Sequence, residues 1–354
     1  MTKYFYIVTI FAGVTFLVVI IIITYGFIQT PQSIETKKDT IKTIDNFSKD
    51  ETVSFAFGGD VMLGRYVGDL FQDNNFEELI SQFDTTLFKE VDIAWVNLEG
   101  PISDKLITQY PSPNNVQFLF SRQAIVGLQK LEVDVVGLAN NHTFNDGKDG
   151  LQTTKEMLEA ADIKWHGHPT KVDESSIYRF QKGDTRVSLI AVHTLYDGSA
   201  LGIEELILKE SEAGYFVIVL PHWGVEYKIS HSTRQEELAR AWVANGADLI
   251  IGTHPHVVED AQIILKPDGT QGLVLYSLGN FVFDQVFPKE TQRGLIVRVD
   301  INKKQTKVQM FPVGLKNIRP RYLDGGSETE LIERVCENIA SVCDLEKRTI
   351  TLAS

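Results

Sequence analysis

Cysteine is nearly absent from this chain of 354 residues, which contains only Cys336 and Cys343. Neither residue lies near a candidate metal motif in the sequence. On one continuous helix the two would lie roughly 10 Å apart along the axis, too far for a disulfide bond. We therefore predict two ordinary thiols, since a bridge would require the helix to break near Ser341.

Positive charge is also scarce, because 34 Lys and Arg residues stand against 47 Asp and Glu residues and leave a formal net charge of −13. A nucleic-acid partner normally requires a basic face. We therefore expect no nucleic-acid partner, although an acidic balance alone identifies no ligand.

Charged residues are missing from Tyr4 to Ile28, about 25 residues that as a helix could cross a ~30 Å hydrocarbon core. A cleaved signal peptide is the alternative, but its apolar region is shorter, and no small-x-small site follows in residues 24–28. No cysteine follows that could carry a lipid. Residues 1–29 are therefore predicted to form a retained single-pass transmembrane anchor.

The segment after this stretch, residues 30–51, is polar with little periodicity and predicts a flexible linker. Only Lys3 precedes the apolar stretch. The lysines that follow it are Lys37, Lys38, Lys42 and Lys49. Positive residues prefer the cytoplasm, so this distribution favours a cytoplasmic domain, but large domains can translocate regardless of nearby charge.

Strand-like and helix-like segments alternate after the linker, which predicts the α/β class. Polar residues directly follow each of the apolar segments Val53–Phe57, Ile93–Val96, Val133–Leu138, Phe216–Leu220 and Leu249–Ile251. Between the last two segments, a capping box at residues 233–236 and an apolar face predict a crossover helix. Ligands in such folds gather outside the carboxyl ends of the strands, where these polar residues would lie.

The polar residues at the predicted strand ends are candidate metal ligands. Taken singly, each has an ordinary interpretation: a turn former for Asp60 and Asn97, a solvated carboxylate for Glu99, a helix cap for Asn141 and a core histidine for His222. Together with His254 and His256, which a stiff Pro-containing turn lets converge, they mix carboxylate, amide and imidazole. That mixture suits Mn, Fe or Zn, and we predict a divalent metal site.

Other histidines and aromatic residues have plainer interpretations. His166 and His168 form a second H-x-H with no carboxylate neighbour and are predicted to lie in a surface turn. Packing or solvated positions are predicted for His193 and His231. Core positions are predicted for Phe281, Phe283 and Phe287.

Six ordered segments resemble motifs of the CapA family of capsule (poly-γ-glutamate) biosynthesis proteins, which is related to calcineurin-like metallophosphoesterases. They are FGGDVMLGR, VNLEGPIS, GLANNHTFNDG, HWGVEY, GTHPHVVE and YSLGNFVFD. The resemblance implies a metallophosphoesterase-like sandwich of two β-sheets flanked by helices over residues 52–325. Residues 326–354 are predicted to form a C-terminal helical tail.

The resemblance also implies a two-metal centre between the strand ends. The implied metal ligands are Asp60, Glu99, Asn141, His222, His254 and His256, and His142 resembles a histidine proposed to protonate a leaving group. Asn97 and Asn280, at strand ends, are predicted to bind substrate.

One position departs from the pattern, because Met62 stands where metallophosphoesterases usually carry a histidine. One metal would then lose a ligand, since a thioether binds hard divalent ions poorly, and either one or two ions are expected. Arg65, in the same loop and a second candidate catalytic residue, could hold a phosphate or a carboxylate bidentately, which suits a polyanion of glutamate.

Two functions follow. The first is a membrane-anchored, cell-surface protein of capsule or poly-γ-glutamate synthesis or export, which binds the anionic polymer or other membrane proteins of a capsule-synthesis complex. The second is a metal-dependent phosphoester hydrolase at the cell surface. The predicted anchor favours the first function, and the histidines favour the second. From the resemblance, and against the lysine distribution, we expect the large domain to be extracellular.

Overall fold

The computed structural model describes residues 52–71, 76–104 and 117–353, and the structural statements below concern these residues. The predicted transmembrane anchor, residues 1–29, and the predicted linker, residues 30–51, lie outside them. Within the described part of the chain, no helix is both long and apolar enough to cross a bilayer.

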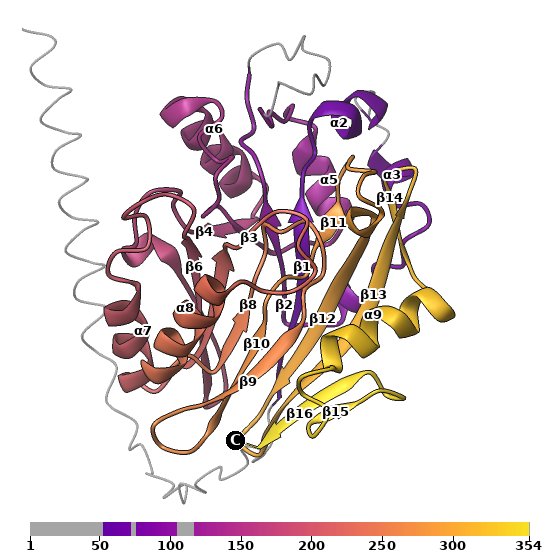
Figure 1. The fold of residues 1–354 in the computed structure, drawn as a ribbon. Coiled ribbons are helices and arrows are strands. Elements are labelled where there is room, and N and C mark those ends of the chain that lie inside the picture. Colours follow the sequence, from indigo (N-terminus) through magenta and orange to yellow (C-terminus); the bar gives the residue numbers. More distant parts are fainter. Residues whose placement is uncertain (1–51, 72–75, 105–116, 354) are drawn as a thin grey trace, which may run out of the picture. The chain divides into compact units, whose positions relative to one another are not determined.

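Two β-sheets form the centre of the described chain (Figure 1). The larger sheet contains β1 (Val53–Val61), β2 (Ile93–Leu98), β3 (Val135–Gly137), β4 (Lys164–His166), β11 (Asn280–Val282), β12 (Arg293–Ile301), β13 (Gln305–Lys316), β14 (Arg319–Tyr322), β15 (Cys343–Asp344) and β16 (Thr349–Ala353). Their order is β15-β16-β13-β12-β1-β2-β3-β4, with β11 paired to β1 and β14 to β13. The strands from β1 to β4 run parallel, whereas β12 is antiparallel to both of its neighbours.

The smaller sheet contains β5 (Ile177–Lys182), β6 (Thr185–His193), β7 (Phe216–His222), β8 (Leu249–Ile251), β9 (Ala261–Leu265) and β10 (Gln271–Leu275). Their order is β5-β6-β7-β8-β10-β9. The central strands β6, β7, β8 and β10 are parallel to one another, and the outer strands β5 and β9 are antiparallel to them. Parallel strands therefore form one side of the larger sheet, β1 to β4, and the centre of the smaller sheet.

Side chains alternate between the two faces of each sheet because successive residues of a strand point to opposite sides. In β1, Phe55 and Phe57 enter the core between the sheets, whereas Ala56 enters the core on the outer face. In β7, Leu220 belongs to the inter-sheet core and Val219 to the outer one. The central strands are thus buried on both faces, as parallel strands usually are.

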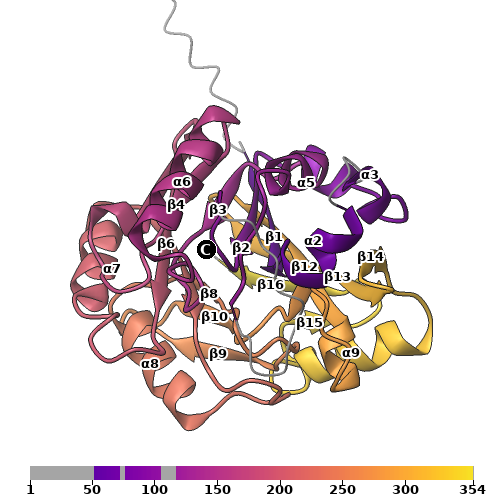
Figure 2. The same cartoon turned by 90° about the horizontal axis from the view of Figure 1, so that it is seen from above.

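Helices cover the outer faces of both sheets (Figure 2). Beside the larger sheet lie α2 (Arg65–Phe71), α3 (Phe76–Leu79), α4 (Thr86–Lys89), α5 (Ala124–Lys130) and α6 (Gly147–Ala160), and beside the smaller sheet lie α7 (Ile203–Glu212) and α8 (Thr233–Ala244). The short 3₁₀ helices are η1 (Glu174–Ser176) and η2 (Lys289–Gln292). Leu128 of α5 and Leu158 of α6 pack in the outer core of the larger sheet, and Trp242 of α8 packs in that of the smaller sheet. The predicted sandwich of two sheets flanked by helices is confirmed.

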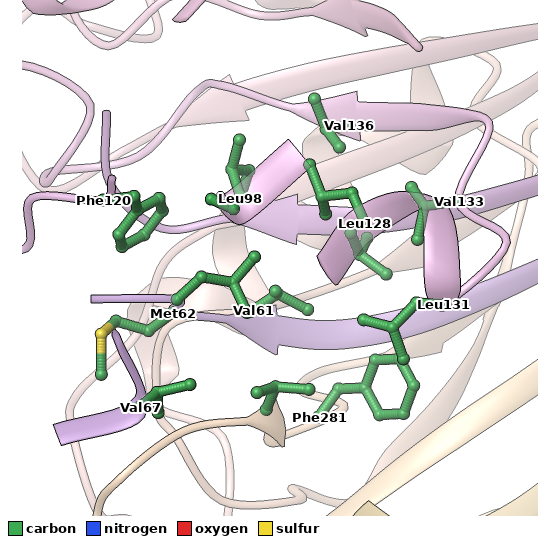
Figure 3. Close-up of a cluster of buried hydrophobic side chains, with 14 of the residues drawn as sticks. Val61, Met62, Val67, Leu98, Phe120, Leu128, Leu131, Val133, Val136 and Phe281 are labelled. Carbon is green, nitrogen blue, oxygen red and sulfur yellow. The ribbon is translucent and has the colours of Figure 1, made fainter. Parts of the chain in front are cut away.

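The outer core of the larger sheet extends to the carboxyl ends of its strands, as Figure 3 shows. Val61 at the end of β1 and Leu98 at the end of β2 belong to this apolar cluster, together with Phe281 of β11. Asp60, the neighbour of Val61, points to the other face, where its Oδ2 accepts a hydrogen bond from the backbone N–H of His254. The apolar cluster therefore fixes the side from which the carboxylate of β1 emerges.

The C-terminal segment differs from the predicted helical tail. Residues 326–354 begin with α9 (Gly326–Cys336), but β15 and β16 follow, and β16 pairs with β13 at the edge of the larger sheet. Because α9 ends at Cys336, the chain can turn back, and Cys336 and Cys343 form a disulfide with a Cα–Cα distance of 5.9 Å. The prediction of two free thiols, which assumed one continuous helix, was wrong.

The predicted crossover between β7 and β8 is present, with α8 as its helix. Its capping box begins one residue earlier than predicted, at Ser232. The Ser232 hydroxyl accepts a hydrogen bond from the Gln235 backbone, and the Gln235 side chain accepts one from the Ser232 backbone. These two bonds satisfy N–H groups that a helix start leaves unpaired.

We expect Gly59→Ala to lower the free energy of unfolding by about 1–3 kcal/mol, the usual cost of forcing an extra carbon into a packed site. A Cβ at position 59 would lie 1.8 Å from the carbonyl oxygen of Gly279, and that oxygen also accepts the backbone hydrogen bond of Asp60. Gly326→Ala is the matched control, because a Cβ there meets nothing within 4 Å. Urea denaturation of both variants measures the difference, and equal stabilities would contradict this account of the close approach.

Candidate metal centre

The six predicted metal ligands come together where the two sheets meet. Asp60 lies at the end of β1, and Glu99 directly follows β2. Asn141 follows β3, His222 ends β7, and His254 and His256 follow β8. Parallel pairing between β1 and β2, and between β7 and β8, brings these chain positions to the same edge. The predicted strand-end cluster is therefore present in the fold.

Glu99 is the centre of the cluster and is fully buried. Its Oε1 lies 3.7 Å from Nε2 of His256, 3.8 Å from Nε2 of His142 and 3.9 Å from Nε2 of His222. Among the described residues, neither of its carboxylate oxygens has a hydrogen-bond donor. Burial, together with the nearby Asp60 carboxylate, raises the pKa of Glu99 well above its usual value.

The unpaired oxygens of Glu99 fit a cation. Burying a carboxylate without hydrogen bonds costs several kcal/mol unless the group is paired or binds a metal. Ligand atoms that share one ion at about 2.0–2.2 Å stand about 3–4 Å from one another, so the separations around Glu99 suit metal coordination. Asp60, Glu99 and His256 also offer ligand atoms that all lie within 4.8 Å of one another.

Asp60 is held from two directions. The side-chain Nδ2 of Asn97 donates to its Oδ1 at 2.8 Å, and the backbone N–H of His254 donates to its Oδ2 at 3.2 Å. Asn97 in turn accepts a hydrogen bond from Nδ2 of Asn140, which also donates to the backbone oxygen of Leu98. Asn97 is therefore buried behind Asp60 and orients its carboxylate. This position differs from the predicted one, in which Asn97 would contact a substrate.

Asn280 has a similar place behind His256. Its Nδ2 donates to the backbone oxygen of Thr291 at 2.9 Å and to Oε1 of Gln285 at 3.0 Å, so the orientation of the amide is fixed. Its Oδ1 must then accept a hydrogen bond from the Nδ1–H of His256, 3.0 Å away. That leaves the Nε2 lone pair of His256 directed toward Glu99. Asn280 is fully buried, so it positions a ligand rather than occupying the predicted substrate-binding place.

His222 and Asn141 face each other, with 2.8 Å between Nε2 of the imidazole and Oδ1 of the amide. The ring of His254 lies 4.8 Å from that of His222, and its Nδ1 has no hydrogen-bond partner in the described structure. Burial and the neighbouring imidazoles lower the pKa of His222 well below its usual value and that of His254 to about 2. Neutral imidazole is the form that binds metal ions.

His142 lies at the edge of this cluster with its ring stacked on Phe118 at a centroid distance of 3.8 Å. Its Nδ1 lies 3.0 Å from Oδ1 of Asn145, an oxygen that also accepts from the backbone N–H of Phe118. Nδ1 of neutral His142 therefore carries the proton, and Nε2 presents a lone pair toward Glu99. Burial lowers the pKa of His142 to about 4.

Arg65 is engaged with a carboxylate of the protein. Its Nε donates to Oδ2 of Asp284 at 3.1 Å, and a second guanidinium nitrogen pairs with the other oxygen of Asp284. The guanidinium carbon lies 4.9 Å from the centre of the Phe118 ring. Arg65 therefore makes its bidentate contact with Asp284 of the same chain. Binding of an external anion by Arg65 stays a prediction.

Met62 supplies no ligand to the cluster. Its side chain is fully buried in the outer core of the larger sheet, in the same cluster as Val67 (Figure 3). Its sulfur lies 3.2 Å from the backbone nitrogen of Gly64, from which it accepts a hydrogen bond. This arrangement agrees with the prediction that position 62 provides no metal ligand.

Four residues near or behind the centre were not predicted to belong to it. Glu226, in the HWGVEY segment, has a ligand atom within 4.8 Å of those of His254 and His256. Asn140 and Asn145 lie in the segment GLANNHTFNDG. Asn140 donates to Asn97, which belongs to the neighbouring strand β2, and Asn145 hydrogen-bonds His142 within the segment. His193 ends β6 and pairs in register with His222, and their rings lie 6.1 Å apart. The sequence signal that could have indicated His193 is its position as a polar residue at the end of an apolar strand-like segment.

Two of the plainer predictions were wrong. His166 does not lie in a surface turn, because it is fully buried at the end of β4, where its Nε2 accepts a hydrogen bond from the Trp95 indole at 2.9 Å. Phe287 is 86% exposed, whereas Phe281 and Phe283 are in the core as predicted. In both cases the local pattern contained no information on which neighbouring element would cover the side chain.

Comparison with known proteins identifies the family of the chain. A family model described as bacterial capsule synthesis protein PGA_cap matches residues 54–285, which contain all of the predicted site residues. "Capsule biosynthesis protein CapA" of Bacillus anthracis is 26% identical over 341 residues, which is 90% of this chain and 79% of the relative. "PGA biosynthesis protein CapA" of Bacillus subtilis (strain 168) is 29% identical over 289 residues, 77% of this chain and 74% of the relative.

Among solved structures, a hypothetical protein from Thermus thermophilus covers 76% of this chain and 96% of its own length, with 14% identity and a TM-score of 0.43. That likeness is too distant to add to the family match. The resemblance to the CapA family that the six segments predicted is confirmed by the two Bacillus relatives. Since the family model also spans more than half of the chain, the chain belongs to the bacterial capsule synthesis protein family PGA_cap.

Proposed function

We propose that this chain is a membrane-anchored, cell-surface protein of capsule poly-γ-glutamate synthesis or export that works through a buried divalent metal centre. The observation that carries the proposal is the fully buried Glu99 carboxylate, whose oxygens lack donors among the described residues while three imidazole nitrogens surround it. Membership of the family and the capsule-related names of both Bacillus relatives support the biological context.

The residues that would hold the metal are Asp60, Glu99, Asn141, His222, His254 and His256. They offer carboxylate oxygens, an amide oxygen and imidazole nitrogens, which suit Mn, Fe or Zn. A divalent ion at this place would polarise a carboxylate or phosphoryl oxygen of a bound molecule. Within the protein, Asn97 orients Asp60 and Asn280 orients His256, so the ligand atoms are held before any ion binds.

The membrane part of the proposal rests on the uncharged stretch from Tyr4 to Ile28, which is long enough to span a bilayer. We propose that the large domain lies outside the cell, where capsule polymer is exported. Its partners would then be the membrane, the anionic polymer and other membrane proteins of a capsule-synthesis complex. The net charge of −13 makes direct contact with a polyanion unfavourable, and a bound cation would offset that repulsion locally.

A second candidate function is hydrolysis of a phosphoester bond, and the position of His142 favours it. Its Nε2 is 3.8 Å from Glu99, within reach of a group bound at the centre. A general acid must carry a proton on the nitrogen that faces its substrate, however, and neutral His142 carries its proton on Nδ1. This tautomer favours a binding or scaffold role over acid catalysis by His142.

We expect His254→Ala and His256→Ala each to weaken metal binding by at least about 10-fold, the loss that even indirect partners of a metal ligand typically cause. His168→Ala is the matched control, because His168 belongs to the other H-x-H segment and hydrogen-bonds Thr170 rather than the cluster. Calorimetric titration with Mn²⁺ or Zn²⁺ measures the affinities. Equal losses in all three variants would contradict the assignment of ligands.

The two candidate functions predict different outcomes for His142→Gln. General acid–base catalysis is typically worth 10²- to 10⁴-fold in rate, so an enzyme that needs His142 should lose most polymer output. We expect output to persist in His142→Gln and to fall in Asp60→Asn and Glu99→Gln, because only the latter two remove charge from the centre. Polymer on intact cells and metal content of the purified proteins are the measurements. Lost polymer with retained metal in His142→Gln would favour the hydrolase.

We expect a protease added to intact cells to degrade the large domain, since the proposed location is outside the membrane. Spheroplasts lysed before treatment give the reference for complete cleavage. The measurement is the loss of full-length chain on an immunoblot. A domain that resists the protease until the cells are lysed would place it in the cytoplasm, as the lysines after the apolar stretch favour.

A further inference from the structure

We propose that Glu226 is a further metal ligand, which forms a second cation position together with His254, beside the position that Asp60, Glu99 and His256 would hold. The inference rests on the proposed metal centre and adds a residue that the strand-end pattern did not include. Ligand atoms of Glu226, His254 and His256 lie within 4.8 Å of one another, and so do those of Asp60, Glu99 and His256. Both groups include His256, so the two positions adjoin, but the one lone pair of His256, at Nε2, serves the position beside Glu99.

The need for such a ligand follows from Met62. A metallophosphoesterase-like centre with two ions would use a histidine at this position, but the thioether of Met62 lies in the apolar core and faces Gly64. β1 therefore contributes Asp60 alone to the cluster. A second ion would need a ligand from another element, and the loop between β7 and α8, which contains Glu226, reaches the histidine pair.

The backbone holds this loop against the H-x-H turn. The N–H of Tyr227, the residue after Glu226, donates to the carbonyl oxygen of Pro255 at 2.8 Å, and Pro255 is the residue between the two histidines. The ring of Tyr227 is stacked on that of His256 with 6.2 Å between centroids. Glu226 is thus adjacent to a backbone contact that is made directly to the metal-binding turn.

A chain of hydrogen bonds connects Tyr227, the residue after Glu226, with His256. Gln285 donates to the Tyr227 hydroxyl at 3.3 Å and accepts from Nδ2 of Asn280, whose Oδ1 lies 3.0 Å from Nδ1 of His256. The loop that contains Glu226 is therefore tied to the support of His256, as supporting residues of one centre usually are.

Three residues at this place have a left-handed backbone conformation. His254, His256 and Tyr227 have φ angles of +99°, +60° and +65°, a region that residues with a side chain rarely adopt. Each such residue costs on the order of 1–3 kcal/mol and persists only where the surrounding structure imposes it. Strain at both histidines and beside Glu226 indicates that these loops are shaped to bring their side chains together.

Exposure distinguishes the two positions. Glu99 is fully buried, whereas Glu226 is exposed and His254 and His256 are buried. A cation beside Glu226 would therefore adjoin solvent, where a carboxylate or phosphate oxygen of a ligand could complete its coordination. This placement makes the outer position the one that would meet an anionic polymer.

Titration of the full-length protein in detergent with Mn²⁺ tests the proposal, with stoichiometry from calorimetry and the pairing of ions from electron paramagnetic resonance. We expect two equivalents in the unmodified protein. In Glu226→Gln the first equivalent should keep its affinity, the second should bind at least about 10-fold more weakly, and the signal of paired ions should disappear. Glu237→Gln is the matched control, because Glu237 is an exposed residue of α8 whose partner is Arg234.

The outcomes separate this inference from the proposed function. Two equivalents with unchanged affinity in Glu226→Gln would overturn the role of Glu226 and leave the metal centre standing. A single equivalent in both proteins would overturn the second position in the same way. No binding at all by the unmodified protein would overturn the metal centre and this inference together.

Discussion

Two carboxylates, Asp60 and Glu99, are fully buried at the edge where the two sheets meet, and the surrounding structure serves to offset their burial. Removing an ion from water costs several kcal/mol unless other groups compensate. Asp60 is compensated within the chain by hydrogen bonds from Asn97 and from the backbone of His254. Glu99 has no such donors among the described residues, and its neighbours include the imidazoles of His142 and His222, whose pKa values burial lowers. A bound cation would compensate the Glu99 carboxylate, which is why the metal proposal rests on this pair of residues.

The sandwich makes this burial possible because each sheet contributes to a different side of the centre. β1 and β2 bring the carboxylates, and β7 and β8 bring the histidines, while apolar residues such as Val61 and Leu98 fill the space behind (Figure 3). Buried amides of Asn97 and Asn280 then determine which atoms of Asp60 and His256 face inward. Rigid strands and fixed tautomers together hold the ligand atoms in place with little reorganisation.

Much of the centre could be predicted from local pattern. Apolar segments followed by polar residues indicated the strand ends, and parallel sheets collect such ends at one edge, so Asp60, Glu99, His222 and the H-x-H pair were found together. Prediction failed where a residue's role depends on a distant segment. Asn280 was assigned to substrate although its amide is used by His256, Thr291 and Gln285, and His166 was assigned to a surface turn although Trp95 covers it. The disulfide was missed because the end of α9 is decided by packing rather than by helix periodicity.

By itself, the sequence determined the α/β class, the identity of the capsule-related segments and the chemical types of the ligands, because these depend on periodicity and on residues close together in the chain. Only the tertiary structure decided that the Met62 side chain enters the core, that Arg65 binds Asp284 and that Glu226 lies beside His254 and His256. Those contacts join segments separated by tens to hundreds of residues. Their geometry is set by how two sheets pack and by which loops then meet at the edge, and no local pattern contains that information.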